Sequence, residues 1–295
     1  MSDTIKKYLN DSFAARWAAL ILIALAMFFA YMFVDVMSPL QSLIESSRGW
    51  DSSVFGSYAA SEYMLNVFGF LIIAGIILDK MGVRFTGIST CALMIIGAGI
   101  KYYAVTHISP LPEAGTIFGL RTQVFVASLG YAIFAMGTEI CGITVTKVIA
   151  KWFKGKEIAL AMGMQVAVAR LGTALALVVS PLIVKEFNMS APLLLALVLL
   201  GVGLLAYLAF CVIDKKFDAQ GAEDEKEDTF KVSDLKLIIT NKGFWLIALL
   251  CLMFYSAVFP FMKYATSLME NKYGMSNVWA GWIPALIPMG NLIMT

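Results

Sequence analysis

The 295-residue sequence has little charge, a single histidine and none of the common catalytic motifs. Charged residues make up 14% of the chain and apolar residues 60%, against about 25% and about 45–50% in ordinary globular proteins. The sequence contains no HExxH, GxSxG or P-loop pattern, so the signatures of zinc proteases, α/β-hydrolases and NTPases are missing. We therefore expect an integral membrane protein that is not an enzyme and needs no cofactor.

The four cysteines do not have the spacing of metal ligands, and we predict no metal site. Each cysteine lies inside an apolar run, and neighbouring cysteines are at least 40 residues apart. We interpret them as small buried hydrophobic side chains. The net charge of +2 is too small to indicate a nucleic-acid partner.

Long apolar runs dominate what is present. A run of about 20 residues crosses the bilayer as a helix, because lipid offers the backbone N–H and C=O groups no other partner. Seven such spans and the start of an eighth can be placed near Trp17–Met37, Phe55–Leu78, Phe85–Val105, Thr122–Ile149, Ile158–Val184, Ala191–Ile213, Gly243–Ser267 and from Val278 onward. The sequence predicts an all-α membrane protein.

The basic residues are distributed unequally between the two sides of these spans. One side, which includes the N-terminus, carries 15 Lys and Arg, the other side carries 6, and Arg170 belongs to neither. Because cytoplasmic loops are enriched in Lys and Arg, we predict a cytoplasmic N-terminus. The expected location is a plasma membrane or a bacterial inner membrane.

A single polar break divides the spans into two sets. We expect a six-helix bundle over residues 1–213, a cytoplasmic charged linker over 214–242, and the start of a second bundle over 243–295. The linker contains the charge run Gly221–Asp228 and a short amphipathic helix predicted near Ser233–Ile239. Since the sequence stops inside an apolar run, we expect a fragment with further spans missing.

A motif after the second span indicates a family. The segment has the form GxxxD[RK]xGxR, with matching residues Gly75, Asp79, Lys80, Gly82 and Arg84. It resembles the loop between the second and third helices of the major facilitator superfamily. The resemblance implies that these five residues form a cytoplasmic gate, in which Val83 stands where the family usually has a second Arg.

A second segment, Trp152–Gly163, resembles the cytoplasmic loop and the small-residue start of the fifth helix in the same superfamily. The order of six spans, a charged linker and further spans agrees with that family. The resemblance implies a six-helix N-terminal bundle plus the first part of the C-terminal bundle. It also implies a transporter whose partners are a small-molecule substrate and the lipid bilayer. An accessory membrane subunit is a further candidate partner.

Two ionisable residues lie deep in the predicted membrane. Glu139 is ten residues from the cytoplasmic end of the fourth span, and Arg170 is twelve residues from that of the fifth. At about 1.5 Å per residue, both lie roughly 15–18 Å from the cytoplasmic side. Such residues are costly in a bilayer, so each requires a partner or a watery cavity.

Two interpretations of this pair stay open. Glu139 and Arg170 could neutralise each other as an ion pair between adjacent helices. Alternatively, they stand apart in a cavity and bind a zwitterion, the guanidinium taking a carboxylate and the carboxylate taking an ammonium. Four further polar side chains near the membrane interior are candidates for lining that cavity: Tyr31, Asn66, Tyr131 and Tyr255.

The sequence also resembles a lysosomal dipeptide-transporter subgroup of the superfamily. The resemblance rests on Glu139 in the fourth span, Arg170 in the fifth and the Gly49–Trp50 pair before the second span. This resemblance implies that Glu139 and Arg170 engage the two ends of a peptide, and makes a lysosomal-type membrane an alternative location. The ExxER signature of proton-coupled peptide transporters is missing from the first span, which argues against a mechanism of that type.

Two alternatives remain. One is an organic-anion carrier of the monocarboxylate or oxalate–formate type, which a lone midplane Arg would suit. The other is a membrane sensor or accessory subunit that does not transport. Three more charged residues, Asp35, Glu62 and Lys263, lie toward the outer ends of their spans and are interpreted as a gate or as surface charges.

Overall fold

The structure is a computed structural model that describes residues 8–111, 115–220 and 232–294. The predicted charge run Gly221–Asp228 lies outside these residues. The elements in chain order are η1 (Leu9–Asp11), α1 (Phe13–Asp35), η2 (Ser38–Leu40), α2 (Gln41–Arg48), α3 (Ser52–Val67), α4 (Phe70–His107), β1 (Thr116–Ile117), β2 (Leu120–Arg121), α5 (Thr122–Trp152), α6 (Ile158–Glu186), α7 (Ala191–Asp218), α8 (Val232–Thr240), α9 (Lys242–Tyr273), α10 (Asn277–Ala280) and α11 (Trp282–Met294).

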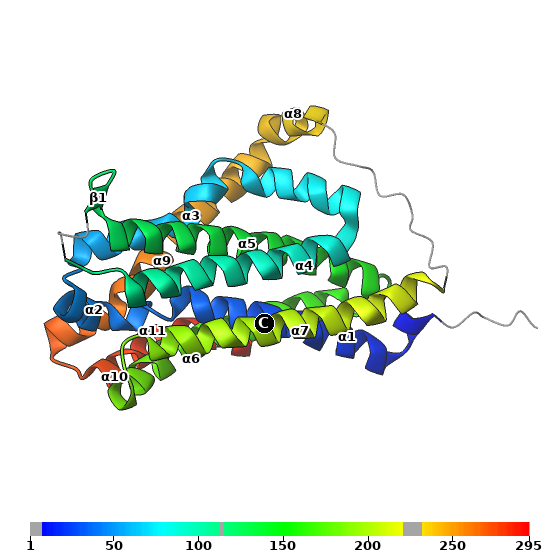
Figure 1. Cartoon of the computed structure of the whole chain (residues 1–295). Coiled ribbons are helices and arrows are strands. Elements are labelled where there is room, and N and C mark those ends of the chain that lie inside the picture. The colour runs from blue at the N-terminus through cyan, green and yellow to red at the C-terminus, as the bar shows by residue number, and fades with distance from the viewer. Residues whose placement is uncertain (1–7, 112–114, 221–231, 295) are drawn as a thin grey trace, which may run out of the picture.

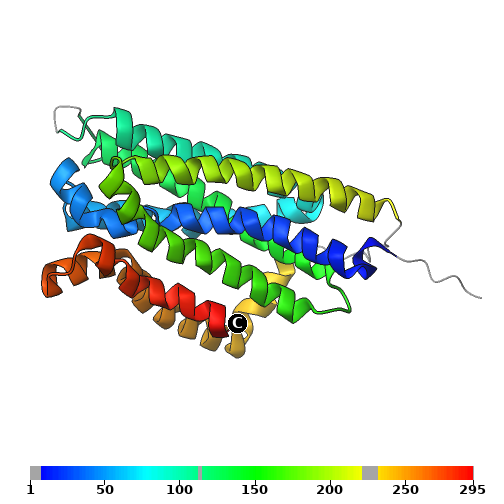
Figure 2. The same ribbon diagram turned by 90° about the horizontal axis from the view of Figure 1, so that it is seen from below.

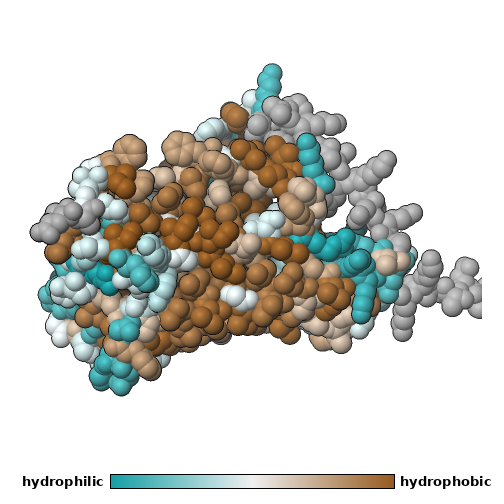
Figure 3. Space-filling model, viewed as in Figure 1, coloured by the Kyte–Doolittle hydropathy of each residue, from teal (hydrophilic) through white to brown (hydrophobic). Residues whose placement is uncertain are grey.

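The fold is all-α and suited to a membrane. Within the described ranges, six helical segments are long and apolar enough to cross a bilayer, the first running from Phe13 to Arg48. On the face seen in Figure 3, hydrophobic side chains form a broad central band between hydrophilic clusters at the two ends. The helix predicted near Ser233–Ile239 is α8. The two-residue antiparallel strands β1 and β2 were not predicted.

The second predicted span is not one continuous helix, which corrects the expectation for Phe55–Leu78. The structure divides it between α3 and the beginning of α4, with Gly69 at the break in a left-handed conformation (φ 82°). A residue with a side chain rarely adopts this conformation, so a glycine allows the interruption where apolar composition alone predicts a helix.

Short polar side chains begin three of the helices. The side chain of Ser12 accepts a hydrogen bond from Ala15 N at the start of α1, and Asp51 accepts from two backbone amides at the start of α3. Asn241 caps α9 in the same way. These caps satisfy backbone donors that have no partner within the helix, so the sequence marks where these three helices start.

The helices α1 to α7, called the first bundle below, run along one long axis (Figures 1 and 2). One end of this bundle, called the linker end, holds the start of α1, the connection from α5 to α6 and the end of α7. The opposite end, called the far end, holds α2 and the β1–β2 hairpin (Figure 1).

Backbone contact between α4 and α5 is unusually close. A Cβ atom placed on Gly130 of α5 would lie 2.6 Å from the backbone nitrogen of Lys101 on α4. Real Cβ atoms do not come this near to backbone, so only glycine permits the observed crossing. The two helices therefore pack backbone against backbone at this level.

The helices α9, α10 and α11, called the second set, contact the first bundle near the far end. Asn277 donates to the backbone oxygen of Pro39 at 2.8 Å, and Tyr264 donates to that of Ser52 at 3.1 Å. The buried residues of α9 are Met262, Lys263, Ala265 and Thr266, whereas its half near the linker end is largely exposed. Contact thus concentrates beyond the middle of α9.

Candidate functional site

A polar cavity lies where the first bundle meets α9. It measures about 420 Å³, a volume that includes space open to the outside, and it is bounded by residues of five helices, α1, α3, α5, α6 and α9. The lining residues are Tyr31, Val34, Asp35, Glu62, Tyr63, Ala135, Thr138, Glu139, Arg170, Phe259 and Lys263. Three carboxylates and two cations therefore face one space.

Lys263 joins the second set to the first bundle at this cavity. Its Nζ lies 2.9 Å from Asp35 Oδ1 and 3.0 Å from Glu62 Oε2. Tyr131 of α5 completes the cluster, since its hydroxyl donates to Glu62 Oε2 at 2.7 Å and accepts from Nζ at 3.1 Å. All four side chains are buried. One ammonium is thus shared by two carboxylates inside the membrane region.

This arrangement corrects one interpretation made from the sequence. Asp35, Glu62 and Lys263 are not surface charges, because their residues are 4%, 7% and 7% exposed. Each lies near the outer end of its apolar run, where solvent exposure is the ordinary outcome. Here the neighbouring helices cover the three side chains, and Lys263 forms an ion pair with each of the two carboxylates.

Lys101 of α4 is a further buried basic residue, which the sequence did not mark as part of a site. It is 0% exposed, and its Nζ has no hydrogen-bond partner in the described structure. The Nζ lies 4.6, 5.2 and 4.2 Å from the ring centroids of Phe33, Tyr58 and Tyr131. Such cation–π contacts stabilise a desolvated ammonium. The only sequence signal was a Lys inside an apolar run.

Glu139 and Arg170 both line the cavity, and the described residues form no ion pair between them. Arg170 instead places its guanidinium carbon 5.0 Å from the ring centroid of Tyr31. Both charged residues are partly exposed to the cavity. The structure therefore brings these three predicted site residues to one space without letting the opposite charges neutralise each other directly.

The other predicted lining residues lie outside the set that bounds the cavity. Tyr131 is behind the wall, buried in the Lys263 cluster. Tyr255 is 43% exposed and stacks on the lining residue Phe259, with ring centroids 5.1 Å apart. Both polar atoms of the Asn66 side chain are buried without a hydrogen-bond partner. Tyr63 and Phe259, which sequence reasoning missed, both line the cavity, and their ring centroids lie 5.7 Å apart.

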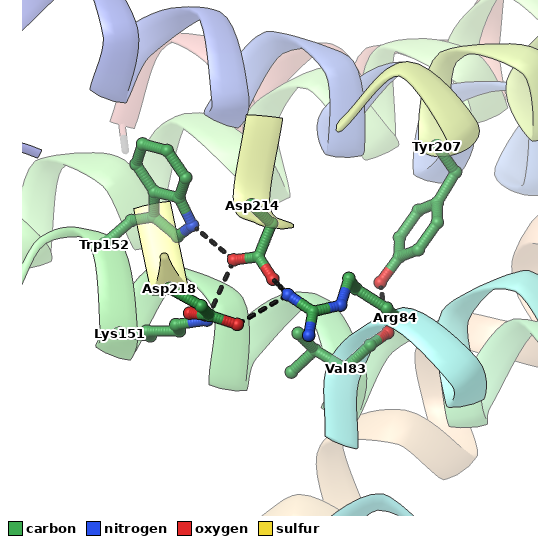
Figure 4. A network of polar contacts seen from close by, with 7 residues as sticks. All are labelled: Val83, Arg84, Lys151, Trp152, Tyr207, Asp214 and Asp218. Carbon is green, nitrogen blue, oxygen red and sulfur yellow. Dashed lines mark hydrogen bonds and ion pairs between the residues drawn. The ribbon is translucent and has the colours of Figure 1, made fainter. Parts of the chain in front are cut away.

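The GxxxD[RK]xGxR segment forms a second charged site, at the linker end. Asp79 binds Lys147 of α5 at 2.9 Å. Arg84 binds Asp214 at 2.9 Å and Asp218 at 2.5 Å, both at the end of α7. Figure 4 shows the Arg84 side of this network. The contacts of Asp79 and Arg84 are thus made within the first bundle.

Asp214 is the centre of the linker-end network. Its side chain is 0% exposed and also accepts from Lys151 Nζ at 3.0 Å and from Trp152 Nε1 at 2.9 Å. Lys151 binds Asp218 at 2.5 Å as well. Figure 4 shows the two cations on opposite sides of the two carboxylates. The network ties the ends of α5 and α7 to the part of α4 that directly follows the kink at Gly82.

The glycines of the motif have different surroundings. Gly82 adopts a left-handed conformation inside α4 (φ 75°), which provides the turn between the second and third predicted spans. Immediately after it, the backbone oxygen of Val83 accepts from Tyr207 of α7 at 2.9 Å. A Cβ atom on Gly75 would meet nothing within 4 Å, so this glycine makes no close helix contact here. Lys80 lies on the exposed surface.

The second family-like segment, Trp152–Gly163, is held to the N-terminal segment by two ion pairs. Lys156 binds Asp11 at 2.6 Å, and Arg16 binds Glu157 at 2.9 Å. The hydrogen bond from Lys156 lowers the pKa of Asp11, and a backbone hydrogen bond together with Arg16 lowers the pKa of Glu157. Both shifts favour the carboxylates, so this tie weakens as the pH falls through their folded-state pKa values.

The long apolar helices and the charged internal cavity define a multi-pass membrane protein with a polar site inside it. Residues 23–295 match the Major Facilitator Superfamily, and the chain belongs to this family.

Several curated relatives are named lysosomal dipeptide transporter MFSD1. The chain is 24% identical to that of Danio rerio over 285 residues, which cover 92% of this chain and 58% of the relative. It is 22% identical to that of Homo sapiens over 291 residues, or 93% of this chain and 58% of the relative. For the Gallus gallus protein the identity is 27% over 186 residues, or 58% of this chain and 42% of the relative. The chain thus spans less than two thirds of the length of these relatives.

Proposed function

We propose that the chain provides the first bundle and the start of the second bundle of a secondary or facilitative transporter, whose cargo is a small zwitterion of the dipeptide or amino-acid type. Cargo crosses by alternating access, with the two bundles rocking around the cavity. The linker end faces the cytoplasm, as the distribution of basic residues supports. The membrane is a plasma, bacterial inner or lysosomal-type membrane.

The observation that carries this proposal is the contrast between the two cations of the cavity. Lys263 is occupied by two carboxylates, whereas Arg170 has an aromatic contact and, among the described residues, no ion pair. A guanidinium in this position can donate two parallel hydrogen bonds to a cargo carboxylate. Glu139 in the same cavity supplies the charge that would receive an ammonium. The names of the relatives support the same class of cargo.

The proposal predicts how two conservative substitutions in the whole protein change the binding of a dipeptide and of a monocarboxylate. Arg170→Lys keeps the charge but loses the planar guanidinium, which can bind a carboxylate through two hydrogen bonds. The affinity for alanyl-alanine should therefore fall about tenfold. Glu139→Gln should weaken alanyl-alanine similarly, yet leave lactate unchanged or improve it, because a charge that repels an anion is removed. Both affinities are measured by thermal-shift titration and by counterflow in liposomes.

Matched controls are Arg48→Lys and Glu186→Gln, which make the same changes outside the cavity and should leave both affinities unaltered. If lactate binds better than alanyl-alanine to the unmodified protein, the organic-anion alternative is correct. Binding without counterflow would instead indicate a sensor. If Glu139→Ala combined with Arg170→Ala folds and transports normally, the zwitterion site is wrong.

The linker-end motif predicts a change in rate without a change in affinity. If the Asp79–Lys147 pair stabilises one conformation of the gate, Asp79→Asn should slow counterflow several-fold and leave the affinity for alanyl-alanine within about twofold. The control is Asp11→Asn, which removes another partly exposed ion pair at the same end. Loss of affinity with a normal counterflow rate would contradict a gating role.

A further inference from the structure

We infer that a second pocket of the first bundle, near the far end, binds one anionic phospholipid, with an acyl chain in the pocket and the lipid phosphate on Arg48. The pocket measures about 350 Å³, a volume that includes space open to the outside. It shares no lining residue with the polar cavity and is therefore a separate site, called the lipid pocket below. The inference goes beyond the proposed function and does not depend on it.

The walls of the lipid pocket suit a hydrocarbon chain. Arg48 is its one charged lining residue, and the other lining side chains are apolar. They come from the end of α1 with η2 and α2, from Trp50, from the end of α4, and from the start of α7 with the loop before it. The indole of Trp50 donates to Gln123 Oε1 at 3.0 Å, so its polar atom already has a partner. A ligand in this pocket therefore meets hydrophobic side chains and one cation.

The lipid pocket borders the surface that faces lipid chains. Val105 of α4 and Leu193 of α7 form part of its wall. Close to them in the sequence, Tyr103, Leu194 and Val198 are 56%, 44% and 58% exposed. Hydrophobic side chains cover much of the face on which α4 and α7 are seen (Figures 1 and 3). The wall of the pocket is thus continuous with helices that present apolar side chains to the bilayer.

The lipid pocket also lies at the depth where acyl chains meet headgroups. Its lining residues Met37, Val105 and Leu193 lie at or next to the far ends of three predicted spans. Such ends mark the boundary of the hydrocarbon, because apolar runs match its thickness. Arg48 ends α2, which follows the first of these spans, and so lies on the headgroup side of that boundary. A phospholipid places its phosphate at this level.

Arg48 has no counter-ion of its own. It is partly buried, and within the described ranges no side chain forms an ion pair or a hydrogen bond with its guanidinium. Of the acids near it in the sequence, Asp51 caps α3 and Glu45 is exposed. Arg121 donates to the backbone oxygen of Arg48 at 3.4 Å, which brings a second guanidinium to this edge of the pocket. A partly desolvated cation of this kind favours an anion beside it.

A lipid phosphate fits an unpaired guanidinium above an apolar pocket. Arg binds phosphate oxygens through parallel hydrogen bonds, and basic pockets between membrane helices bind anionic headgroups. A zwitterionic phospholipid such as phosphatidylcholine also has a phosphate, but its quaternary ammonium would be repelled by Arg48 and Arg121. Inorganic phosphate lacks the chain and a fatty acid lacks the phosphate. The combination therefore selects an anionic phospholipid such as phosphatidylglycerol.

Native mass spectrometry of the whole protein in detergent tests the headgroup. Phosphatidylglycerol should bind as one molecule, about tenfold more tightly than phosphatidylcholine with the same chains. Arg48→Gln should remove this preference. Lys185→Gln removes an exposed cation at the same end but outside the pocket, and it should leave the preference unchanged. Equal affinity for the two lipids, or equal effects of the two substitutions, would overturn the inference.

A second set of measurements tests the chain. Val105→Phe fills the pocket and leaves Arg48 in place, so the affinity for phosphatidylglycerol should fall about tenfold. Leu194→Phe, at an exposed neighbouring position, is the control and should have no effect.

Competing ligands give the same answer without a substitution, should Val105→Phe fail to fold. Neither glycerol phosphate, which has no chain, nor laurate, which has no phosphate, should displace phosphatidylglycerol at equal concentration. Displacement by glycerol phosphate would show that the chain is not bound, and displacement by laurate would identify a fatty acid as the ligand. Either result would overturn the inference. No cargo is present in these measurements, so their outcome is independent of the proposed function.

Discussion

Replacing Asp214 with alanine is expected to lower the free energy of unfolding by about 3 kcal/mol, the lower end of the range for breaking a buried ion pair. Asp214 is fully buried and accepts from Arg84, Lys151 and Trp152. Alanine leaves these donors without their shared acceptor. The effect stays at the lower end because Arg84 and Lys151 are 40% and 23% exposed and regain some water.

The measurement is chemical or thermal unfolding of the whole protein in detergent. Asp218→Ala is the matched control, because Asp218 binds the same two cations but is 35% exposed. It should cost less than about 1 kcal/mol, as partly exposed ion pairs do. Equal losses for the two variants would show that burial of Asp214 is not what makes this network stabilising.

Lys263→Met should be as damaging or more so, costing about 3–5 kcal/mol at neutral pH. Methionine fills a similar volume but leaves the buried carboxylates of Asp35 and Glu62 without the ammonium that joins them. Because protonation neutralises a stranded carboxylate, the loss should shrink as the pH is lowered toward about 5. Unfolding measured as a function of pH tests both parts of this prediction.

Two further variants serve as controls for that result. Lys272→Met removes an exposed lysine from the same helix and should change the stability by less than about 0.5 kcal/mol. Adding Asp35→Asn and Glu62→Gln to Lys263→Met should recover most of the loss, since no charge then remains unpaired. A triple variant as unstable as Lys263→Met alone would show that packing of the lysine stem, not its charge, is what matters.

Local rules explain what could be predicted from the sequence. Apolar runs and their lengths located the helices, because a bilayer leaves backbone groups no partner outside a helix. The depth of Glu139 and Arg170 followed from the fixed rise per residue, and the structure places both on one cavity. The break at Gly69 was missed, since composition does not reveal where the backbone departs from helical dihedral angles.

Long-range pairing could not be predicted in the same way. Asp35 and Lys263 are 228 residues apart, and no single-sequence pattern says which helices are neighbours. Each of the two, taken alone, resembles a charge at the end of a span. The aromatic surroundings of Lys101 were missed for the same reason, because they combine side chains from α1, α3 and α5 around a residue of α4.

The backbone contact between α4 and α5 has a mechanical consequence. At Gly130 no side chain separates the two backbones, so any residue larger than glycine at this position would push the two helices apart. Lys101 lies at this crossing, and Arg84 lies on the same helix about 25 Å away, at 1.5 Å per residue. A small change in the tilt of α4 at the crossing would displace Arg84, at the linker end, by several ångströms. The ion pairs of Arg84 and Lys151 with Asp214 therefore hold α4 and α5 against α7 at the end that lies far from the crossing.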